Sequence, residues 1–88
     1  MRVPLLLRVL QAVGQRIREL REERGLTQAQ VAERLESQVG NYQNVEHGKR
    51  NVTMETLVNI ATVLDVPIEE LFVPPTSKRR GPGRPRSR

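Results

Sequence analysis

The chain has 88 residues, which allows one small domain, and its 36% hydrophobic content includes only two aromatic residues. Because it contains no cysteine and a single histidine, the composition excludes a disulfide scaffold, a thiolate zinc site and cysteine catalysis, and it argues against an enzyme, a metal site or a cofactor. The formal net charge of +5 reflects 15 basic and 10 acidic residues, and the excess lies in residues 74–88, which hold six basic residues and no acid, so a polyanion is the expected partner.

The first expected helix begins at Pro4 and ends before Gly25, two residue types that suit a first helical turn and the left-handed position after the last turn. Its apolar residues recur every three or four positions, as on one face of a helix: Leu6, Leu10, Val13, Ile17 and Leu20. Because glycine weakens a helix, Gly14 is expected to set apart an N-terminal arm or extension at residues 1–12. The apolar residues of this arm either pack in the core or dock on a second subunit, and the sequence leaves both open.

The apolar start of this arm faintly resembles a signal sequence. Arg8 interrupts the apolar run, and no small-residue cleavage pattern follows it. No apolar run approaches the roughly 18 residues of a membrane-spanning helix. We therefore expect a cytoplasmic protein with no membrane partner.

Four further helices are expected, and no segment has a convincing strand pattern. The second begins after Thr27, which together with Gln30 has the spacing of a capping box. The third spans about residues 38–46, a fourth follows Thr53, and a short fifth runs through residues 67–72. The short connection between the second and third helices is typical of a helix-turn-helix, in which one helix crosses the DNA backbone and the next enters the major groove.

Three runs carry a resemblance that extends over about 60 residues: 14–28 (GQRIRELREERGLTQ), 45–51 (VEHGKRN) and 64–72 (LDVPIEELF). In their order and spacing these runs resemble the Xre/Cro/phage-repressor helix-turn-helix family. The resemblance implies an all-α, five-helix, lambda-repressor-like domain over residues 13–73 that binds operator DNA, usually as a homodimer. Residues 74–88 are then expected to form a disordered basic tail.

The resemblance implies phosphate contacts from two parts of the chain. Gln28 stands in the first turn of the second helix, where its amide and free backbone N–H groups can both meet a phosphate. His47, Lys49 and Arg50 follow the third helix, in a loop that lies along the DNA backbone in this family. Each cation there can neutralise one phosphate.

The resemblance also pairs Arg21 of the first helix with Glu46 at the end of the third. Such a pair would lock the third helix to the scaffold, although desolvation offsets part of the attraction. Tyr42 occupies an inward-facing position, so its ring is expected in the core.

The groove-facing positions of the third helix comprise Gly40, which offers no side chain, and five expected base-contacting residues: Gln38, Val39, Asn41, Gln43 and Asn44. Amide side chains can form two hydrogen bonds with adenine, and Val39 can touch a thymine methyl. The turn before this helix departs from the family pattern. Glu36 stands where the family usually has glycine, and Ser37 stands where it usually has an apolar residue.

Residues 78–86, KRRGPGRPR, are similar to an AT-hook, whose Gly-Arg-Pro centre is here residues 83–85. The residues expected in a narrow A·T-rich minor groove are Arg80, Gly83, Arg84, Pro85 and Arg86. The usual hook has arginine where this chain has Pro82, so a plain basic tail without groove preference is the alternative. Either form would add salt-dependent affinity for DNA.

Together these features predict a sequence-specific, double-stranded-DNA-binding transcriptional regulator, most simply a repressor, of a bacterium or phage and associated with the nucleoid. Two alternatives stay open: an interaction protein such as an antitoxin that wraps a toxin, or an architectural binder of A·T-rich DNA. No phosphate loop, nucleophile motif or metal-ligand set supports an enzyme. A small-molecule substrate is not expected, because so small a domain leaves no room for an effector pocket of ordinary size.

Overall fold

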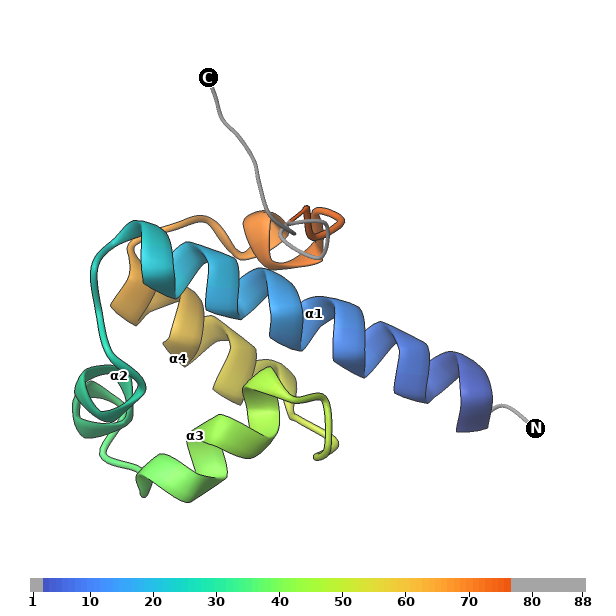
Figure 1. Ribbon diagram of the computed structural model, residues 1–88, viewed down its shortest axis with the longest axis horizontal. Coiled ribbons are helices and arrows are strands. Elements are labelled where there is room, and N and C mark those ends of the chain that lie inside the picture. The colour runs from blue at the N-terminus through green and yellow to red at the C-terminus, as the bar shows by residue number, and fades with distance from the viewer. Residues whose placement is uncertain (1–2, 77–88) are drawn as a thin grey trace.

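Figure 1 shows the computed structural model, which describes residues 3–76. These residues form four α-helices, one 3-10 helix and no strand: α1 (Val3–Glu23), α2 (Gln28–Arg34), α3 (Val39–Glu46), α4 (Met54–Leu64) and η1 (Ile68–Phe72). Helix α1 packs against α3 and η1, α2 packs against α3 and α4, and η1 also packs against α4. The predicted all-α fold is confirmed, and its short fifth element is a 3-10 helix.

A small, mostly aliphatic core joins all five elements: Val13, Ile17, Leu20, Val31, Ala32, Tyr42, Leu57, Ile60, Ala61, Leu64 and Leu71. The ring of Tyr42 lies inward, as expected from its position. Leu71 of η1 is fully buried, and beside it Arg16 Nη2 donates to Glu70 Oε1 at 2.7 Å. Since burying one such aliphatic side chain contributes roughly 1.5–3 kcal/mol, η1 is an integral part of the core and closes it against α1.

Local signals in the sequence set the ends of the helices. The backbone N–H of Gln30 donates to Thr27 Oγ1 at 3.0 Å, and the N–H of Thr27 donates to Gln30 Oε1 at 2.8 Å, which completes the predicted capping box before α2. Thr53 caps α4 by accepting from the N–H of Thr56 at 3.0 Å. Each α-helix is followed by a residue in the left-handed region: Gly25, Glu36, Gly48 and Asp65.

The turn between α2 and α3 contains Glu36 at φ 57°, where the resemblance expects glycine. The N–H of Glu36 donates to the carbonyl of Glu33 at 3.0 Å, and the N–H of Ser37 donates to the carbonyl of Ala32 at 2.9 Å. These two bonds form the C-terminal cap that usually carries glycine at its left-handed position. The turn therefore keeps this geometry with a glutamate, at a conformational cost of roughly 1–2 kcal/mol.

Helix α1 runs unbroken through Gly14, so that the arm expected at residues 1–12 is, from Val3 on, the beginning of α1. A Cβ atom at Gly14 would lie 2.4 Å from the carbonyl oxygen of Val45 and 2.5 Å from that of Glu46. Gly14 is therefore the point at which α1 touches the backbone of α3, and it marks a helix contact instead of a break.

The N-terminal turns of α1 project beyond the other helices in Figure 1. Their apolar side chains are open to solvent: Leu5 is 65% exposed, Leu6 46%, Leu7 44% and Val9 45%. In a single copy of the chain these residues take no part in the core. Although α1 has 21 residues, neither it nor any other described helix is apolar enough over sufficient length to cross a membrane.

Candidate nucleic-acid interface

Glu46, the last residue of α3, is bonded to two other helices. Arg21 on α1 donates from Nε to Glu46 Oε2 at 2.6 Å and from Nη2 to Oε1 at 3.2 Å, and from Nη1 to the carbonyl of Leu26 at 2.8 Å. Gln28 at the start of α2 donates from Nε2 to Glu46 Oε1 at 3.0 Å. The side chain of Glu46 is 1% exposed and that of Arg21 10%, so this cluster fixes α3 to both α1 and α2 from within.

Burial and hydrogen bonding shift the pKa in opposite directions for Glu46 and Arg21. Burial alone would raise the pKa of Glu46, but the hydrogen bonds from Arg21 and Gln28 outweigh it and hold the pKa of the carboxyl below its ordinary value. The hydrogen bonds to Glu46 raise the pKa of Arg21. Burial likewise raises the pKa of Tyr42, whose hydroxyl lies near the same carboxylate without a hydrogen bond of ordinary geometry.

Gln43 on α3 extends this cluster towards the surface. Its Nε2 donates to Gln28 Oε1 at 2.9 Å. Because the Glu46 carboxylate can only accept, Gln28 must present its NH₂ group to Glu46 and its oxygen to Gln43. The orientation of both amides is thereby fixed, and the Gln43 oxygen and its second N–H have no hydrogen bond within residues 3–76.

The sequence does not predict this contact, because it places Gln28 on a phosphate and Gln43 on a base. The two residues are 15 positions apart in the sequence, and their meeting depends on how α2 crosses α3. A capping or periodicity pattern carries no such information.

The expected base-contacting residues lie at the start of α3 and along its solvent side. Gln38 immediately precedes α3 and does not cap it with its side chain. Gln38, Val39 and Asn41 are exposed, whereas Gln43 and Asn44 are half-buried. Gly40 lies among them and is also exposed. The face of α3 that is free to meet a ligand is therefore mostly amide in character, with one apolar side chain.

The three expected phosphate-contacting residues of the α3–α4 loop, His47, Lys49 and Arg50, are all exposed. Arg50 Nη1 donates to Asn41 Oδ1 at 3.3 Å, which ties the loop to α3. The loop therefore adds two formal cations beside the exposed face of α3.

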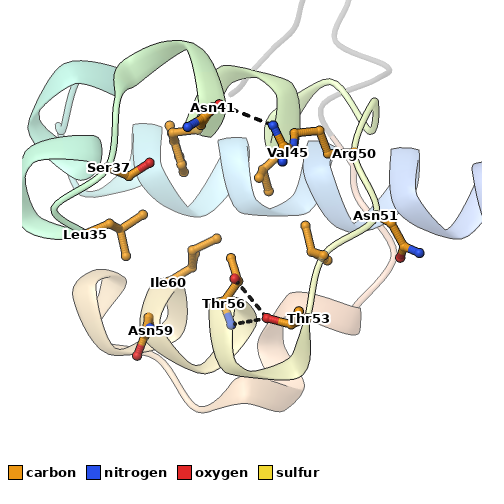
Figure 2. A pocket seen from close by; sticks show the side chains of 12 residues that line it. Leu35, Ser37, Asn41, Val45, Arg50, Asn51, Thr53, Thr56, Asn59 and Ile60 are labelled. Atoms are coloured by element: carbon orange, nitrogen blue, oxygen red, sulfur yellow. Dashed lines mark hydrogen bonds between the residues drawn. The ribbon is translucent and has the colours of Figure 1, made fainter.

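A hollow of about 300 Å³ lies between α3, this loop and the start of α4. Figure 2 shows Asn41 and Arg50 on one side of it and Thr53 and Thr56 on the other. Its volume is at the lower end of the range found for ligand pockets, whereas the sequence suggested no room for an ordinary effector pocket. The hydrogen bonds of Arg50 to Asn41 and of Thr53 Oγ1 to Thr56 Oγ1 already use polar groups of its lining.

The residues expected in the minor groove, Arg80, Gly83, Arg84, Pro85 and Arg86, lie outside the described residues. Within residues 3–76, no three His, Asp or Glu side chains are placed to share a metal ion. The candidate interface is thus composed of α3, the first turn of α2 and the α3–α4 loop.

Known proteins are similar to this chain in sequence and in fold. Residues 17–71 match the family model described as Helix-turn-helix (HTH_3). The transcriptional regulator RamB of Mycobacterium tuberculosis is 41% identical over 54 residues, 61% of this chain, although the chain spans only 11% of the length of RamB. The HTH-type regulator y4dJ of Sinorhizobium fredii is 39% identical over 62 residues, which are 70% of this chain and 80% of y4dJ.

Among solved structures, the restriction-modification controller protein C.AhdI from Aeromonas hydrophila is similar, with a TM-score of 0.69 and 40% sequence identity. The match covers 72% of this chain and 96% of C.AhdI. Since the family model covers more than half of the chain and the matched region contains α2, the turn and α3, the resemblance to the Xre/Cro-type helix-turn-helix family is confirmed. The chain belongs to the helix-turn-helix family of DNA-binding transcriptional regulators.

Proposed function

We propose that this chain is a homodimeric repressor that reads a two-fold-symmetric operator with α3 in the major groove. The observation that carries the proposal is the buried cluster at Glu46, which fixes α3 to α1 and α2 while its amide-bearing face stays open. A reading helix must keep its register on the scaffold, because a displacement changes which base edges its side chains meet.

The proposed base contacts follow from the chemistry of the exposed amides. Gln43 has one acceptor and one donor left over from its bond to Gln28, which is the pattern that complements N6 and N7 of adenine. Asn41, Asn44 and Gln38 offer the same pair of groups, and Val39 offers a methyl contact to thymine.

The proposed phosphate contacts flank the groove. Gln28 retains one N–H at the first turn of α2, where free backbone N–H groups also favour an anion. His47, Lys49 and Arg50 would follow the adjacent backbone. Residues 74–88 would add salt-dependent affinity, with residues 83–85 in an A·T-rich minor groove.

The homodimer is proposed from the start of α1. Leu5, Leu6, Leu7 and Val9 form an apolar end of a helix that nothing in residues 3–76 of a single copy covers, and exposed apolar patches of this kind favour association. Leu6→Glu should convert a dimer into a monomer, measured by light scattering, with Arg18→Gln, which lowers the net charge by the same single unit, as the control on the same helix. A wild-type chain that is monomeric alone but forms a stable complex with an unrelated protein would instead favour the interaction-protein alternative.

The experiment that tests the function is selection of bound duplexes from a random DNA pool. It compares the full chain with a chain that ends at Thr76. We expect both to recover the same inverted repeat, with half-sites about one helical turn, roughly 34 Å, apart. Recovery of A·T-rich DNA by the full chain and of nothing by the shorter one would overturn the repressor and favour an architectural role. The expected site of action is the bacterial nucleoid in the cytoplasm.

A further inference from the structure

Gly40 is the one glycine among the four in residues 3–76 that the protein's own structure does not require. A Cβ atom at Gly14 would lie 2.4 Å from a carbonyl oxygen of α3, and one at Gly48 would lie 2.6 Å from Gln11 Cα. Gly25 and Gly48 both have positive φ, 69° and 70°. Gly40 has neither feature, since its φ is not positive and a Cβ atom would meet no packing partner from residues 3–76 within 4 Å.

Glycine is also an unfavourable choice at this position. Gly40 is the second residue of α3, a helix of only eight residues. Any residue with a side chain other than proline would favour the helix more. Neither backbone conformation nor packing within residues 3–76 explains the glycine, whereas close contact with a bound partner would explain it.

The position of Gly40 indicates where that reason lies. Successive residues turn by about 100° around a helix, so Gly40 lies roughly 160° around α3 from Tyr42, whose side chain is buried in the core. Asn44, one turn further along, shares the outward face with Gly40. Val39 and Asn41, the two neighbours of Gly40, are exposed. Gly40 is thus at the middle of the face that the proposed function turns towards DNA.

We propose that Gly40 is a notch in the recognition helix, through which duplex DNA approaches the α3 backbone more closely than a Cβ atom allows. This inference rests on the proposed function, because it needs α3 in the major groove. The notch makes Gly40 a specificity-determining residue although it has no side chain. It also means that the helix keeps a residue that lowers its stability for the sake of binding.

The test is Gly40→Ala in the full chain, with thermal unfolding and DNA affinity measured on the same preparations. The unfolding midpoint should stay equal or rise by about 4 °C, because alanine favours the helix and meets open space. Affinity for the selected operator should fall by at least about tenfold, which is the loss that one mismatched base pair typically causes. Gly40→Ser and Gly40→Leu should bind progressively less well.

Thr62→Ala is the matched control. Thr62 is exposed on α4, and its hydroxyl donates only to the carbonyl of Val58 in its own helix, at 2.8 Å. This variant should also favour a helix, yet it should leave DNA affinity unchanged. It separates the effect of a more stable fold from the effect of an added methyl on the reading face.

The outcomes distinguish this inference from the function on which it rests. A wild-type chain that selects no DNA contradicts the proposed function itself. A wild-type chain that binds its operator, together with a Gly40→Ala variant that binds equally well, overturns the notch alone. Where affinity falls, operators with uracil in place of single thymines test which group enters the notch. Recovery of Gly40→Ala binding at one position indicates a thymine methyl, and no recovery indicates another group of the duplex.

Discussion

Gly14 of α1 lies so close to Val45 of α3 that a Cβ atom at residue 14 would stand 2.4 Å from the Val45 carbonyl oxygen. Gly14→Ala should therefore lower the free energy of unfolding by about 1–3 kcal/mol, the usual cost of overpacking, even though alanine favours a helix by about 1 kcal/mol. Urea denaturation measures the change. Gly40→Ala is the control in open space, and a Gly14→Ala variant more stable than wild type would show that α1 and α3 do not touch here.

Removing the charge partner of Glu46 should be among the most damaging single changes. Arg21→Met leaves a carboxylate that is 1% exposed without its cation, and such a loss costs about 3–5 kcal/mol. The double change Arg21→Met/Glu46→Leu should recover most of that stability. The side chain of Arg18, which forms an ion pair with Glu22, is 57% exposed. Arg18→Met therefore serves as the control and should cost less than about 1 kcal/mol. If the double variant lost as much stability as the two single variants together, Arg21 and Glu46 would not be a coupled pair.

The same carboxyl predicts how stability depends on acid. The pKa of Glu46 is lower in the folded chain than its ordinary value of 4.5, so the unfolded state takes up a proton first as the pH falls. The stabilisation is therefore complete above about pH 4.5 and is lost as the pH falls through the lowered pKa. Urea midpoints between about pH 3 and pH 7 should show a steeper acid decline in wild type than in Glu46→Gln. Parallel declines would assign the acid sensitivity to other groups.

Replacing Glu36 should raise the stability of the fold instead of lowering it. Its φ of 57° is disfavoured for any residue with a side chain, so Glu36→Gly should raise the free energy of unfolding by up to about 1 kcal/mol, after the greater freedom of glycine in the unfolded chain is subtracted. The unfolding midpoint should rise by about 4–8 °C per kcal/mol. Glu36→Ala keeps the Cβ atom and removes the carboxylate, and a gain of equal size there would attribute the effect to charge.

The two cations of the α3–α4 loop should contribute to the salt dependence of DNA binding. If Lys49 and Arg50 each neutralise one phosphate, Lys49→Gln and Arg50→Gln should each reduce the slope of log affinity against log salt by about 1. Titrations of the operator at several salt concentrations give these slopes. Arg18→Gln changes the net charge equally from an exposed site on α1, and a slope change as large in that variant would mean that only overall charge matters.

Those parts of the fold that depend on neighbouring residues could be predicted from the sequence. Thr27 and Thr53 begin helices because their hydroxyls accept from N–H groups three residues later, and Gly25 ends one because it adopts a positive φ. These are interactions within one turn of chain. The pairing of Arg21 with Glu46 was expected only from the family resemblance, because the two residues lie 25 positions apart.

Other features could not be inferred from a local pattern. Leu6 and Val13 belong to one helical stripe, yet Leu6 is 46% exposed and Val13 8%. The difference arises because the loop at Gly48 lies against Gln11, so that the body of the domain ends near that residue. Periodicity identifies the face of a helix but not how far along that face other elements reach. The bond between Gln43 and Gln28 likewise depends on how α2 crosses α3, which no local pattern encodes.

The closing position of η1 has a consequence for how the protein is made. Ile17 and Leu20 emerge early from the ribosome, whereas Leu71, which completes their enclosure, is among the last core residues to be synthesised. The contacts of Arg16 with the carboxylate and the carbonyl of Glu70 likewise join the two ends of the domain. The core that Leu71 completes can therefore close only after residue 71 has left the exit tunnel, and co-translational folding of this domain is coupled to the synthesis of η1.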